Sequence, residues 1–353
     1  MARLRFGFVG AGEIAVASAE AIAETTNAST AVVFDVRPEL AADLAARSGA
    51  RVAASLDELL SATDVDAVYI CVPHFLHRDA AERATSAGKH VFIEKPMGVS
   101  VGDALAIADA CRSRGLACGV PFVAREAPAY RAARVIVSSG SIGDVTGFTI
   151  TFLADKPPSY WAAGWSGRVQ DDWRTSWSTA GGGVLLMNAI HDIDAILSIT
   201  GLEVERVATA ITTPSGGPVE VEDTAVGILT CTGGALGGVE ARAAVPGSSG
   251  PAARWVNRIY GTRGQLLLPS PWSDDGYALY TRTSAGWSEI EPEPSASARA
   301  RAFEGFAAAV LAGSPPPVGA ADGVRASRIV HAMYEAARRG DVVDVGGPAG
   351  RTG

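Results

Sequence analysis

The sequence predicts an α/β domain with a doubly wound parallel sheet, followed by an α+β domain with an open, mainly antiparallel sheet and helices. Three observations support this fold class. Strand and helix signals alternate at short intervals over the first third of the chain. The strands there are near-continuous apolar runs, as expected of strands buried on both faces. Further along, β-like segments separated by Gly, Pro and Ser turns dominate.

The first region alternates strands with helices. Apolar and β-branched runs predict strands at Leu4–Val9, Thr30–Asp35, Ala67–Val72, His90–Ile93 and Leu116–Val120. Helical spacing predicts helices at Glu13–Glu24, Pro38–Arg47, His77–Ala87 and Val101–Arg114. Gly49, Gly88 and Gly115 suit the ends of three helices, while Ser100 and Asp103 resemble a capping box.

The second region is predicted to be mainly β. Its strands are expected at Val145–Leu153, Val204–Thr212, Thr224–Leu229, Leu236–Ala243, Arg254–Tyr260 and Tyr277–Thr281. Helices are expected at Val184–Thr200, Arg299–Ala312 and Ala320–Arg339. We expect the two domains to meet near Val120–Pro128.

Composition excludes several classes of protein. The 353 residues carry a formal charge of −8, which gives no electrostatic reason to bind nucleic acid or an anionic membrane. The four cysteines form no C-x-x-C pair, so no metal site is predicted. No uniformly apolar window of about 20 residues predicts a membrane span, and the N-terminus does not resemble a secretory signal. We therefore expect a soluble, cytoplasmic protein.

A glycine-rich turn follows the first strand and opens the first helix. Gly10, Gly12 and Ala15 form the pattern G-x-G-x-x-A, which is weak alone but stands in the context that pyrophosphate binding requires. Gly10 permits the tight turn, Gly12 lets the backbone approach the phosphates, and Ala15 lets helix and strand pack closely. The alternative is a plain strand–helix turn in a glycine-rich protein.

Asp35 ends the second strand, 20 residues after Ala15. A carboxylate there can accept hydrogen bonds from both ribose hydroxyls and would repel a 2′-phosphate, which favours NAD over NADP. Arg37 could offset that repulsion, so NADP stays open. The alternative is an acidic surface residue at a strand end.

Further motifs cluster in the run VPHFLHRDAAERATSAGKHVFIEKPMGVS, which contains Pro73, His77 and the Glu94-Lys95-Pro96 triplet. At these residues the sequence resembles the Gfo/Idh/MocA family of NAD(P)-dependent sugar and polyol oxidoreductases. The resemblance continues in AREAPAY, DDWR and GGGVLLMNAIHDID and covers essentially the whole chain.

The resemblance implies an organisation of the chain. Residues 1–122 are expected to form a Rossmann domain that binds the dinucleotide. Residues 123–345 are expected to form the domain for substrate binding and oligomerisation, and residues 346–353 a flexible tail. An open sheet face needs a cover, so we expect a homodimer or homotetramer.

Lys95 is the lysine that carries most information. The chain has 30 Lys and Arg residues, and only Lys89, Lys95 and Lys156 among them are lysines. A group that must change its protonation state cannot be replaced by Arg, whose pKa is too high. Lys95 follows a strand at the carboxyl edge of the predicted sheet, where ligands bind in such folds. Pro96 restricts its backbone, and the bond between them could be cis. The alternative is a structural Lys–Glu pair.

His191 lies on the helix that follows the GGG turn, and Met187, Asn188 and Asp194 share its face. The resemblance makes His191 a candidate proton-transfer or substrate-binding group, whereas an isolated helical histidine is usually a packed core residue. The family commonly has Asp four residues before this histidine, but here that position is Met187. This departure puts a three-residue proton relay in doubt; Asn188 can bind a hydroxyl group but cannot transfer a proton.

The segment Tyr160–Trp177 holds four of the seven tryptophans. Its aromatic faces and charged groups suit a carbohydrate pocket, whereas the alternatives are an interface or a packed loop. The expected substrate-binding residues are Arg125, Trp165, Trp173, Arg174, Asn188 and His191. The expected cofactor-binding residues are Gly10, Ala11, Gly12, Glu13, Ile14, Asp35, Arg37, Val72, Pro73, His77, Glu94 and Lys95.

These residues predict an NAD(P)-dependent dehydrogenase or reductase that acts on a secondary alcohol of a sugar, polyol or cyclitol. Lys95 and His191 are the expected catalytic residues. One alternative is an NAD-dependent glycoside hydrolase that uses transient oxidation. Another is a non-catalytic sensor of a nucleotide or sugar, which would be expected to lack Lys95 or His191.

Overall fold

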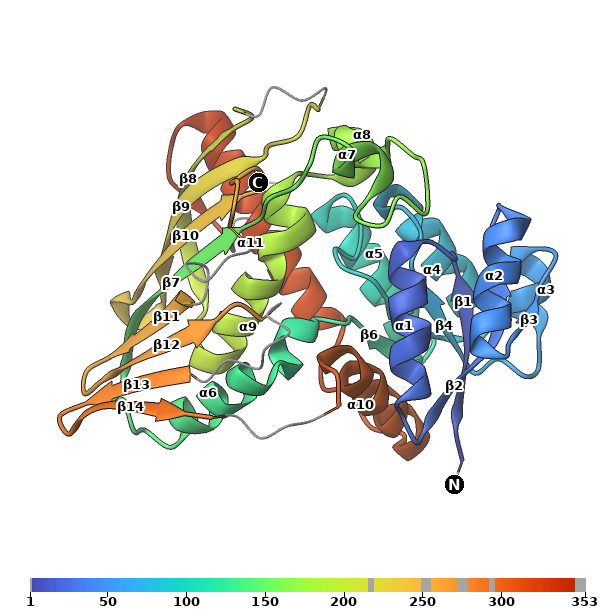
Figure 1. The fold of residues 1–353 in the computed structure, drawn as a ribbon, viewed down its shortest axis with the longest axis horizontal. Helices are drawn as coiled ribbons and strands as arrows, with labels where there is room; N and C mark the ends of the chain where they lie inside the picture. Colours follow the sequence, from blue (N-terminus) through green and yellow to red (C-terminus); the bar gives the residue numbers. More distant parts are fainter. Residues whose placement is uncertain (1, 215–218, 249–254, 272–278, 292–295, 347–353) are drawn as a thin grey trace. The chain divides into compact units, whose positions relative to one another are not determined.

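The computed structural model describes residues 2–214, 219–248, 255–271, 279–291 and 296–346. These residues form two compact units that alternate along the chain (Figure 1). The first comprises Met1–Val123, Ser159–Gly181 and Ala296–Arg325. The second comprises Ala124–Pro158, Gly182–Ser295 and Ala326–Gly353. The expected tail, apart from Gly346, lies outside the described residues.

The first unit contains the predicted parallel sheet. In the described residues six strands pair in the order β3-β2-β1-β4-β5-β6, and every pair is parallel. They are β1 (Leu4–Val9), β2 (Ala28–Phe34), β3 (Arg51–Val52), β4 (Ala67–Ile70), β5 (His90–Ile93) and β6 (Cys118–Gly119). This order confirms the doubly wound fold. Strand β3 was not predicted because its two exposed residues form no apolar run.

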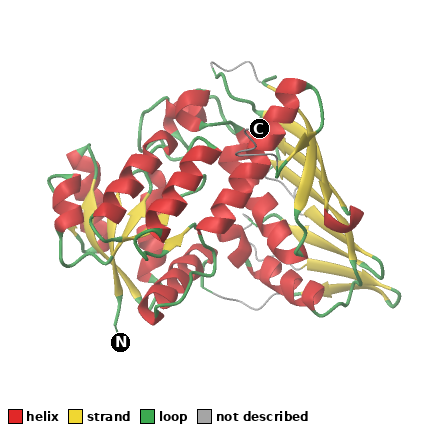
Figure 2. Cartoon of the chain, turned by 180° about the vertical axis from the view of Figure 1, so that it is seen from behind, coloured by secondary structure: helices red, strands yellow, loops and turns green. Residues whose placement is uncertain are grey.

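Helices pack around this sheet, as Figure 2 shows. They are α1 (Glu13–Ala23), α2 (Pro38–Ser48), α3 (Leu56–Ser61), α4 (His77–Ser86), α5 (Val101–Arg112) and α10 (Ala298–Ala312). Two predicted helix ends are confirmed. Gly49 ends α2 with its backbone in the left-handed region. Ser100 begins α5, where its Oγ accepts a hydrogen bond from the backbone N–H of Asp103. The short helix α3 was not predicted.

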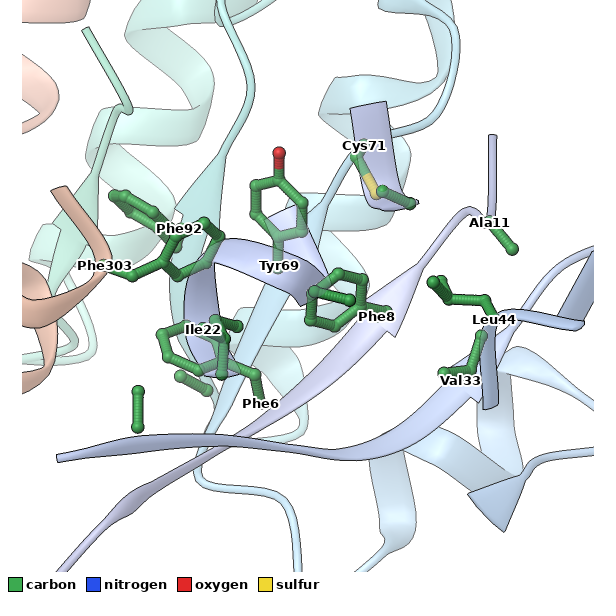
Figure 3. Close-up of a cluster of buried hydrophobic side chains, with 14 of the residues drawn as sticks. Phe6, Phe8, Ala11, Ile22, Val33, Leu44, Tyr69, Cys71, Phe92 and Phe303 are labelled. Carbon is green, nitrogen blue, oxygen red and sulfur yellow. The ribbon is translucent and has the colours of Figure 1, made fainter. Parts of the chain in front are cut away.

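Helix α10 belongs to the first unit although it comes from the far end of the chain. Phe303 lies edge-on to Phe6, Tyr69 and Phe92, with ring centroids 5.4, 5.1 and 4.9 Å apart (Figure 3). Phe306 stacks on Phe92 at 4.6 Å. This helix was expected in the second domain, because apolar spacing predicts a helix but not the sheet that it covers.

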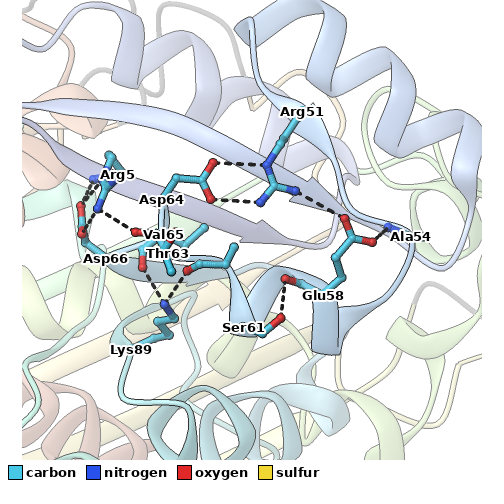
Figure 4. Close-up of polar contacts among 11 residues, drawn as sticks. Arg5, Arg51, Ala54, Glu58, Ser61, Thr63, Asp64, Val65, Asp66 and Lys89 are labelled. Atoms are coloured by element: carbon cyan, nitrogen blue, oxygen red, sulfur yellow. Dashed lines mark hydrogen bonds and ion pairs between the residues drawn. The ribbon is translucent and has the colours of Figure 1, made fainter.

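Ionic contacts join the segment before β4 to neighbouring strands (Figure 4). Arg5 pairs with Asp66 at 2.7 Å, and Arg51 lies 3.0 Å from Asp64. Lys89 Nζ donates to the carbonyl oxygens of Ala62 and Val65, both at 2.8 Å. The ion pairs are exposed to solvent, so each contributes little to stability. Their main effect is to orient the turn that leads into β4.

The second unit contains a mixed sheet. In the described residues nine strands pair in the order β14-β13-β12-β11-β7-β10-β9-β8-β15. Only the pairing of β10 with β7 is parallel among the described pairs, which confirms the mainly antiparallel sheet. The strands are β7 (Val145–Leu153), β8 (Val204–Thr212), β9 (Thr224–Cys231), β10 (Leu236–Arg242), β11 (Trp255–Gly261), β12 (Gln265–Pro269), β13 (Leu279–Thr283), β14 (Gly286–Ile290) and β15 (Val343–Asp344). Strands β12, β14 and β15 were not predicted, and the start of the predicted strand at Tyr277–Thr281 lies outside the described residues.

Helices of the second unit lie along one face of this sheet (Figure 2). They include α6 (Pro128–Ser138), which was not predicted, α9 (Ile190–Thr200) and most of α11 (Ala320–Arg339). Trp177–Thr200 is a helical stretch long and apolar enough to cross a membrane, but 89% of its most apolar window is buried inside the protein. Burial of this extent is typical of a core helix.

The predicted helix at Val184–Thr200 is present, but its first turn differs from an α-helix. Its first part, Leu185–Ala189, is a turn of π-helix. The backbone N–H groups of Gly183 and Leu185 donate to the Glu222 carboxylate at 2.7 and 2.9 Å. The backbone N–H of Leu186 donates to the Tyr334 hydroxyl. These partners come from distant segments, so spacing in the sequence could not predict the wider turn.

Phe303→Ala should destabilise the first unit by about 3–5 kcal/mol, because it removes a buried ring from the aromatic cluster. Leu311→Ala, on the same helix but 45% exposed, is the matched control and should cost less than about 1 kcal/mol. Urea unfolding followed by circular dichroism measures both. Equal losses would show that α10 is not anchored through Phe303.

Candidate active site at the edge of the parallel sheet

The glycine-rich turn between β1 and α1 has the geometry of a dinucleotide-binding turn. Gly10 has a φ of +102°, and a Cβ there would lie 2.8 Å from the Cys71 carbonyl oxygen. A Cβ at Gly12 would meet only Val169, at 3.8 Å, so this side of the turn is open. In the described residues no side chain caps α1, which leaves its first N–H groups for an anion. The turn therefore fits a pyrophosphate.

Asp35 is held rigidly at the end of β2. Its Oδ2 accepts the backbone N–H of Ala11 at 2.7 Å, and its Oδ1 accepts that of Arg37 at 2.8 Å. Each carboxylate oxygen can accept a second hydrogen bond, so both remain able to bind hydroxyl groups. This arrangement fits the ribose of a dinucleotide.

The segment Ser159–Gly181, which we call the covering segment, packs on the same edge within the first unit. The Glu13 carboxylate accepts the backbone N–H groups of Trp165 and Ser166. Arg168 donates to the Ala11 carbonyl oxygen at 3.0 Å and pairs with Asp43 at 2.7 Å. The segment predicted as a carbohydrate wall thus also contacts the cofactor-binding turn.

The far part of the covering segment packs against the loop after β4. His74 Nδ1 lies 2.7 Å from the Ala180 carbonyl oxygen, and its ring lies 4.5 Å from that of Trp173. The Arg174 guanidinium lies 4.6 Å from the centroid of Trp173 and 5.6 Å from that of Tyr160. Two of the predicted substrate-binding residues, Trp173 and Arg174, therefore lie together, and the exposed Trp165 packs on Tyr160 at 5.1 Å.

His77 opens α4, as predicted, and is fully buried. Its Nδ1 lies 2.9 Å from the Pro96 carbonyl oxygen and its Nε2 lies 3.0 Å from that of Val72. Two carbonyl partners favour the charged ring, but burial outweighs them and lowers the pKa of His77 to about 4. The ring is therefore neutral at pH 7 and connects the loops after β4 and β5.

Lys95 follows β5, and its peptide bond to Pro96 is cis, as the sequence analysis allowed. The preceding Glu94 is buried, and its carboxylate accepts the Tyr69 hydroxyl at 2.6 Å and the Arg299 guanidinium at 3.1 Å. The backbone N–H of Lys95 also donates to Glu94 Oε2, at 3.2 Å. These contacts fix the backbone from which the Lys95 side chain extends.

Tyr160, which the sequence did not single out, lies beside the predicted substrate-binding residue Arg174. Burial raises the pKa of its hydroxyl, while the charges of Arg174 and Lys95 act in the opposite direction. Burial lowers the pKa of His74, with a smaller contribution from the Lys95 charge. The Lys95 charge thus acts on both the His74 and the Tyr160 ring. The aromatic-rich composition of Tyr160–Trp177 was the available signal for Tyr160.

The second unit holds the other predicted catalytic residue. His191 lies in the first turn of α9 and is buried. In the π-helical turn just before it, Asn188 Oδ1 accepts a hydrogen bond from Lys156 Nζ. Lys156 is buried too, and it was absent from the predicted substrate-binding set. Its position in the loop after β7 gave no pattern that links it to Asn188.

Arg125, another predicted substrate-binding residue, is bound to Asp194. Its Nε and Nη2 each lie 2.6 Å from a carboxylate oxygen of Asp194, and both side chains are buried. Such a paired contact ties the start of the second unit to α9. Asp192, on the same helix, accepts a hydrogen bond from the Asn257 side chain at 2.8 Å.

Among the described residues no three His, Cys, Asp or Glu side chains are grouped to hold a metal.

Comparisons with known proteins identify the family. A model described as the oxidoreductase family with an NAD-binding Rossmann fold matches residues 4–122, and the model of the GFO/IDH/MocA C-terminal domain matches residues 130–267. The chain belongs to the Gfo/Idh/MocA family. It thus has an NAD(P)-binding Rossmann fold and is a member of a family of sugar oxidoreductases, as the resemblance implied.

Named relatives of the family include dehydrogenases and reductases. The 1,5-anhydro-D-fructose reductase of Ensifer adhaerens is 28% identical over 349 residues, which cover 97% of this chain and 98% of the relative. The levoglucosan dehydrogenase of Pseudarthrobacter phenanthrenivorans is 30% identical over 261 residues, 67% of this chain and 64% of the relative.

Solved structures agree with the family assignment. A levoglucosan dehydrogenase in complex with NADH superposes with a TM-score of 0.86 at 25% identity, covering 97% of this chain and 99% of that one. The aldose-aldose oxidoreductase of Caulobacter crescentus, complexed with glycerol, has a TM-score of 0.85 at 26% identity, with the same coverage.

The neutral state of His77 can be tested by histidine ring NMR, since the chain has five histidines. We expect the His77 signal, assigned by its loss in His77→Gln, to stay in the neutral form from pH 7.5 down to about pH 5, because its pKa is about 4. The half-buried His90 is the internal comparison and should titrate at higher pH. A His77 midpoint near pH 6.5 would contradict the assignment.

Proposed function

We propose that this protein is an NAD-dependent dehydrogenase or reductase acting on a secondary alcohol of a sugar, polyol or cyclitol. The observation that carries the proposal is the combination of the Gly10–Gly12 turn with Lys95 at the same edge of the sheet, on a backbone fixed by Glu94. Bound NAD would supply the hydride acceptor or donor. The chain's own residues would bind and orient the alcohol and move its proton.

Lys95 is proposed as a proton-transfer residue. It extends from the carboxyl end of β5, where ligands bind in open parallel sheets. Its charge lies near His74, His77 and Tyr160. The two histidines are buried and their pKa values are lowered, so both rings are neutral at pH 7 and the charges of Lys95 and Arg174 act among them. A lysine in such surroundings can give or take the proton of a substrate hydroxyl.

His191 is proposed as the partner group in the second unit. Whichever of Lys95 and His191 does not take the proton would orient the hydroxyl oxygen. Met187 stands where relatives of the family carry a carboxylate, and it is buried and apolar. The Lys156–Asn188 pair provides polar groups one residue further along. We propose that Asn188, oriented by Lys156, binds a substrate hydroxyl and transfers no proton.

The proposed substrate class is supported by side-chain chemistry in the covering segment. The exposed Trp165 and the partly buried Trp173 carry aromatic rings of the kind that pack on the C–H faces of sugars, and Arg174 lies beside Trp173. Relatives are named for an anhydrosugar and an inositol. Asp35 supports NAD as the cofactor, because its fixed carboxylate suits two ribose hydroxyls and opposes a 2′-phosphate.

A homo-oligomer is also proposed, and the second sheet supports it. Val226, Ile228 and Leu236 are 48–59% exposed. The antiparallel register of β9 and β10 places the three side chains on one face. An exposed apolar face of this kind is typical of an interface.

Sedimentation velocity should give a mass of two or four chains for the native protein. Ile228→Asp should lower that mass, because it places a charge on the apolar face. A monomeric native protein would contradict this proposal.

Lys95→Met should lower turnover by about two or more orders of magnitude and leave nucleotide binding in place, because the side chain loses its proton-transfer group but keeps its length. The measurement is nicotinamide absorbance with NAD⁺ or NADP⁺ and a panel of sugars, inositols and sugar acids. Nucleotide binding is followed by tryptophan fluorescence.

Lys89→Met is the matched control for this experiment. Lys89 Nζ binds the carbonyl oxygens of Ala62 and Val65 in the turn before β4, so its loss should leave turnover within about twofold. Near-normal turnover of Lys95→Met would remove Lys95 from the catalytic role. Release of sugar without net NADH would favour the glycoside hydrolase instead.

A further inference from the structure

Two residues at the end of β2 act in opposite ways on a nucleotide's adenosine ribose. Asp35 suits the free 2′-hydroxyl of NAD and opposes the 2′-phosphate of NADP. Arg37 carries a guanidinium group, which binds phosphate through two parallel hydrogen bonds. The choice between the two nucleotides therefore depends on where the Arg37 side chain is directed.

The Arg37 guanidinium is directed at the covering segment. Its Nη2 lies 3.2 Å from the carbonyl oxygen of Gln170 and 3.6 Å from Oδ2 of Asp171. Both partners come from a segment far along the chain that packs back on the first unit. The guanidinium thus already has a carboxylate and a carbonyl as partners.

Asp171 is itself held in place. Its Oδ1 accepts the backbone N–H of Trp173 at 3.1 Å, and its own backbone N–H donates to the Ala162 carbonyl oxygen at 2.7 Å. Arg168, three residues earlier, ties the segment to Asp43. Since one oxygen of Asp171 is bound locally, the other is left facing Arg37.

We propose that Asp171 is a specificity-determining residue: it holds Arg37 away from the ribose 2′ position and so favours NAD over NADP. The proposal rests on the proposed function, since it requires a dinucleotide at this edge. A 2′-phosphate would therefore lose Arg37 as a partner and meet the carboxylate of Asp35. The 2′-hydroxyl of NAD carries no charge and needs no cation.

The test compares binding of NAD⁺ and NADP⁺ by isothermal titration calorimetry, without substrate. Asp171→Asn removes the charge and keeps an oxygen for the Trp173 N–H. We expect the Kd for NADP⁺ to fall about five- to tenfold and that for NAD⁺ to stay within about twofold, because the released Arg37 guanidinium can then bind the 2′-phosphate. Asp172→Asn is the matched control, because it removes the same charge one residue away, and both Kd values should stay within about twofold.

A second set of variants tests whether Asp171 acts through Arg37. Arg37→Ala alone should change the Kd for NADP⁺ little, because Asp171 already occupies the guanidinium. In the Asp171→Asn background, Arg37→Ala should cancel the gain in NADP⁺ affinity. This non-additivity is the signature of a direct coupling between the two residues. Circular dichroism checks that each variant folds, and Asp171→Ser, whose hydroxyl can also accept from Trp173, replaces Asp171→Asn if the latter unfolds.

Three results would overturn the proposal: an unchanged Kd for NADP⁺ in Asp171→Asn, an equal gain in Asp172→Asn, or a gain that survives Arg37→Ala. A native protein that binds neither nucleotide overturns the proposed function, and this proposal with it. A native protein that binds NAD⁺ but oxidises none of the sugars refutes only the substrate class. The comparison of Kd values still decides the role of Asp171 in that case.

Discussion

A buried carboxylate at the end of β5 is the contact on which the candidate site depends. Glu94 lies among apolar side chains, where an unpaired charge would be costly, and it is satisfied by Tyr69 from β4, Arg299 from α10 and the backbone of Lys95. The same group therefore joins two strands to a helix from the end of the chain and fixes the backbone of the proposed catalytic lysine. Fold and site share this one set of hydrogen bonds.

The cofactor edge is built in a comparable way, because backbone groups do most of the positioning. Asp35 is oriented by two N–H groups, and His77 is oriented by two carbonyl oxygens. Such contacts need no matching side chain on the partner. The Asp35 carboxylate is thus oriented by the strand end itself, His77 is buried between the loops after β4 and β5, and the covering segment adds Asp171 and Trp173 to the same edge.

The sequence was informative wherever the signal is local. The first sheet, the Gly10–Gly12 turn and the start of α4 at His77 follow from apolar runs, glycine spacing and capping residues, and all are present in the structure. The second sheet was predicted as mainly antiparallel, but its strands β12, β14 and β15 were not predicted, because strands of two to five residues with mixed burial lack a clear period.

Other features that were missed, besides short elements and helix α6, are contacts between distant segments. The π-helical turn before His191 depends on Glu222, and the Lys156–Asn188 pair joins a loop to a helix. The covering segment was recognised by its aromatic residues, but its partners Glu13 and Asp43 gave no sign of the contact. The roles of Lys95 and His191 rest on the family resemblance and stay predictions.

The alternation of the two units along the chain has a consequence for synthesis. Phe6 and Phe92 belong to early strands, yet the rings that cover them, Phe303 and Phe306, leave the ribosome only after most of the second unit has been made. Many multidomain chains fold their N-terminal domain first, during translation. Here the nascent parallel sheet would keep an apolar face open for most of elongation, so nascent chains would depend on chaperone cover until the final helices emerge.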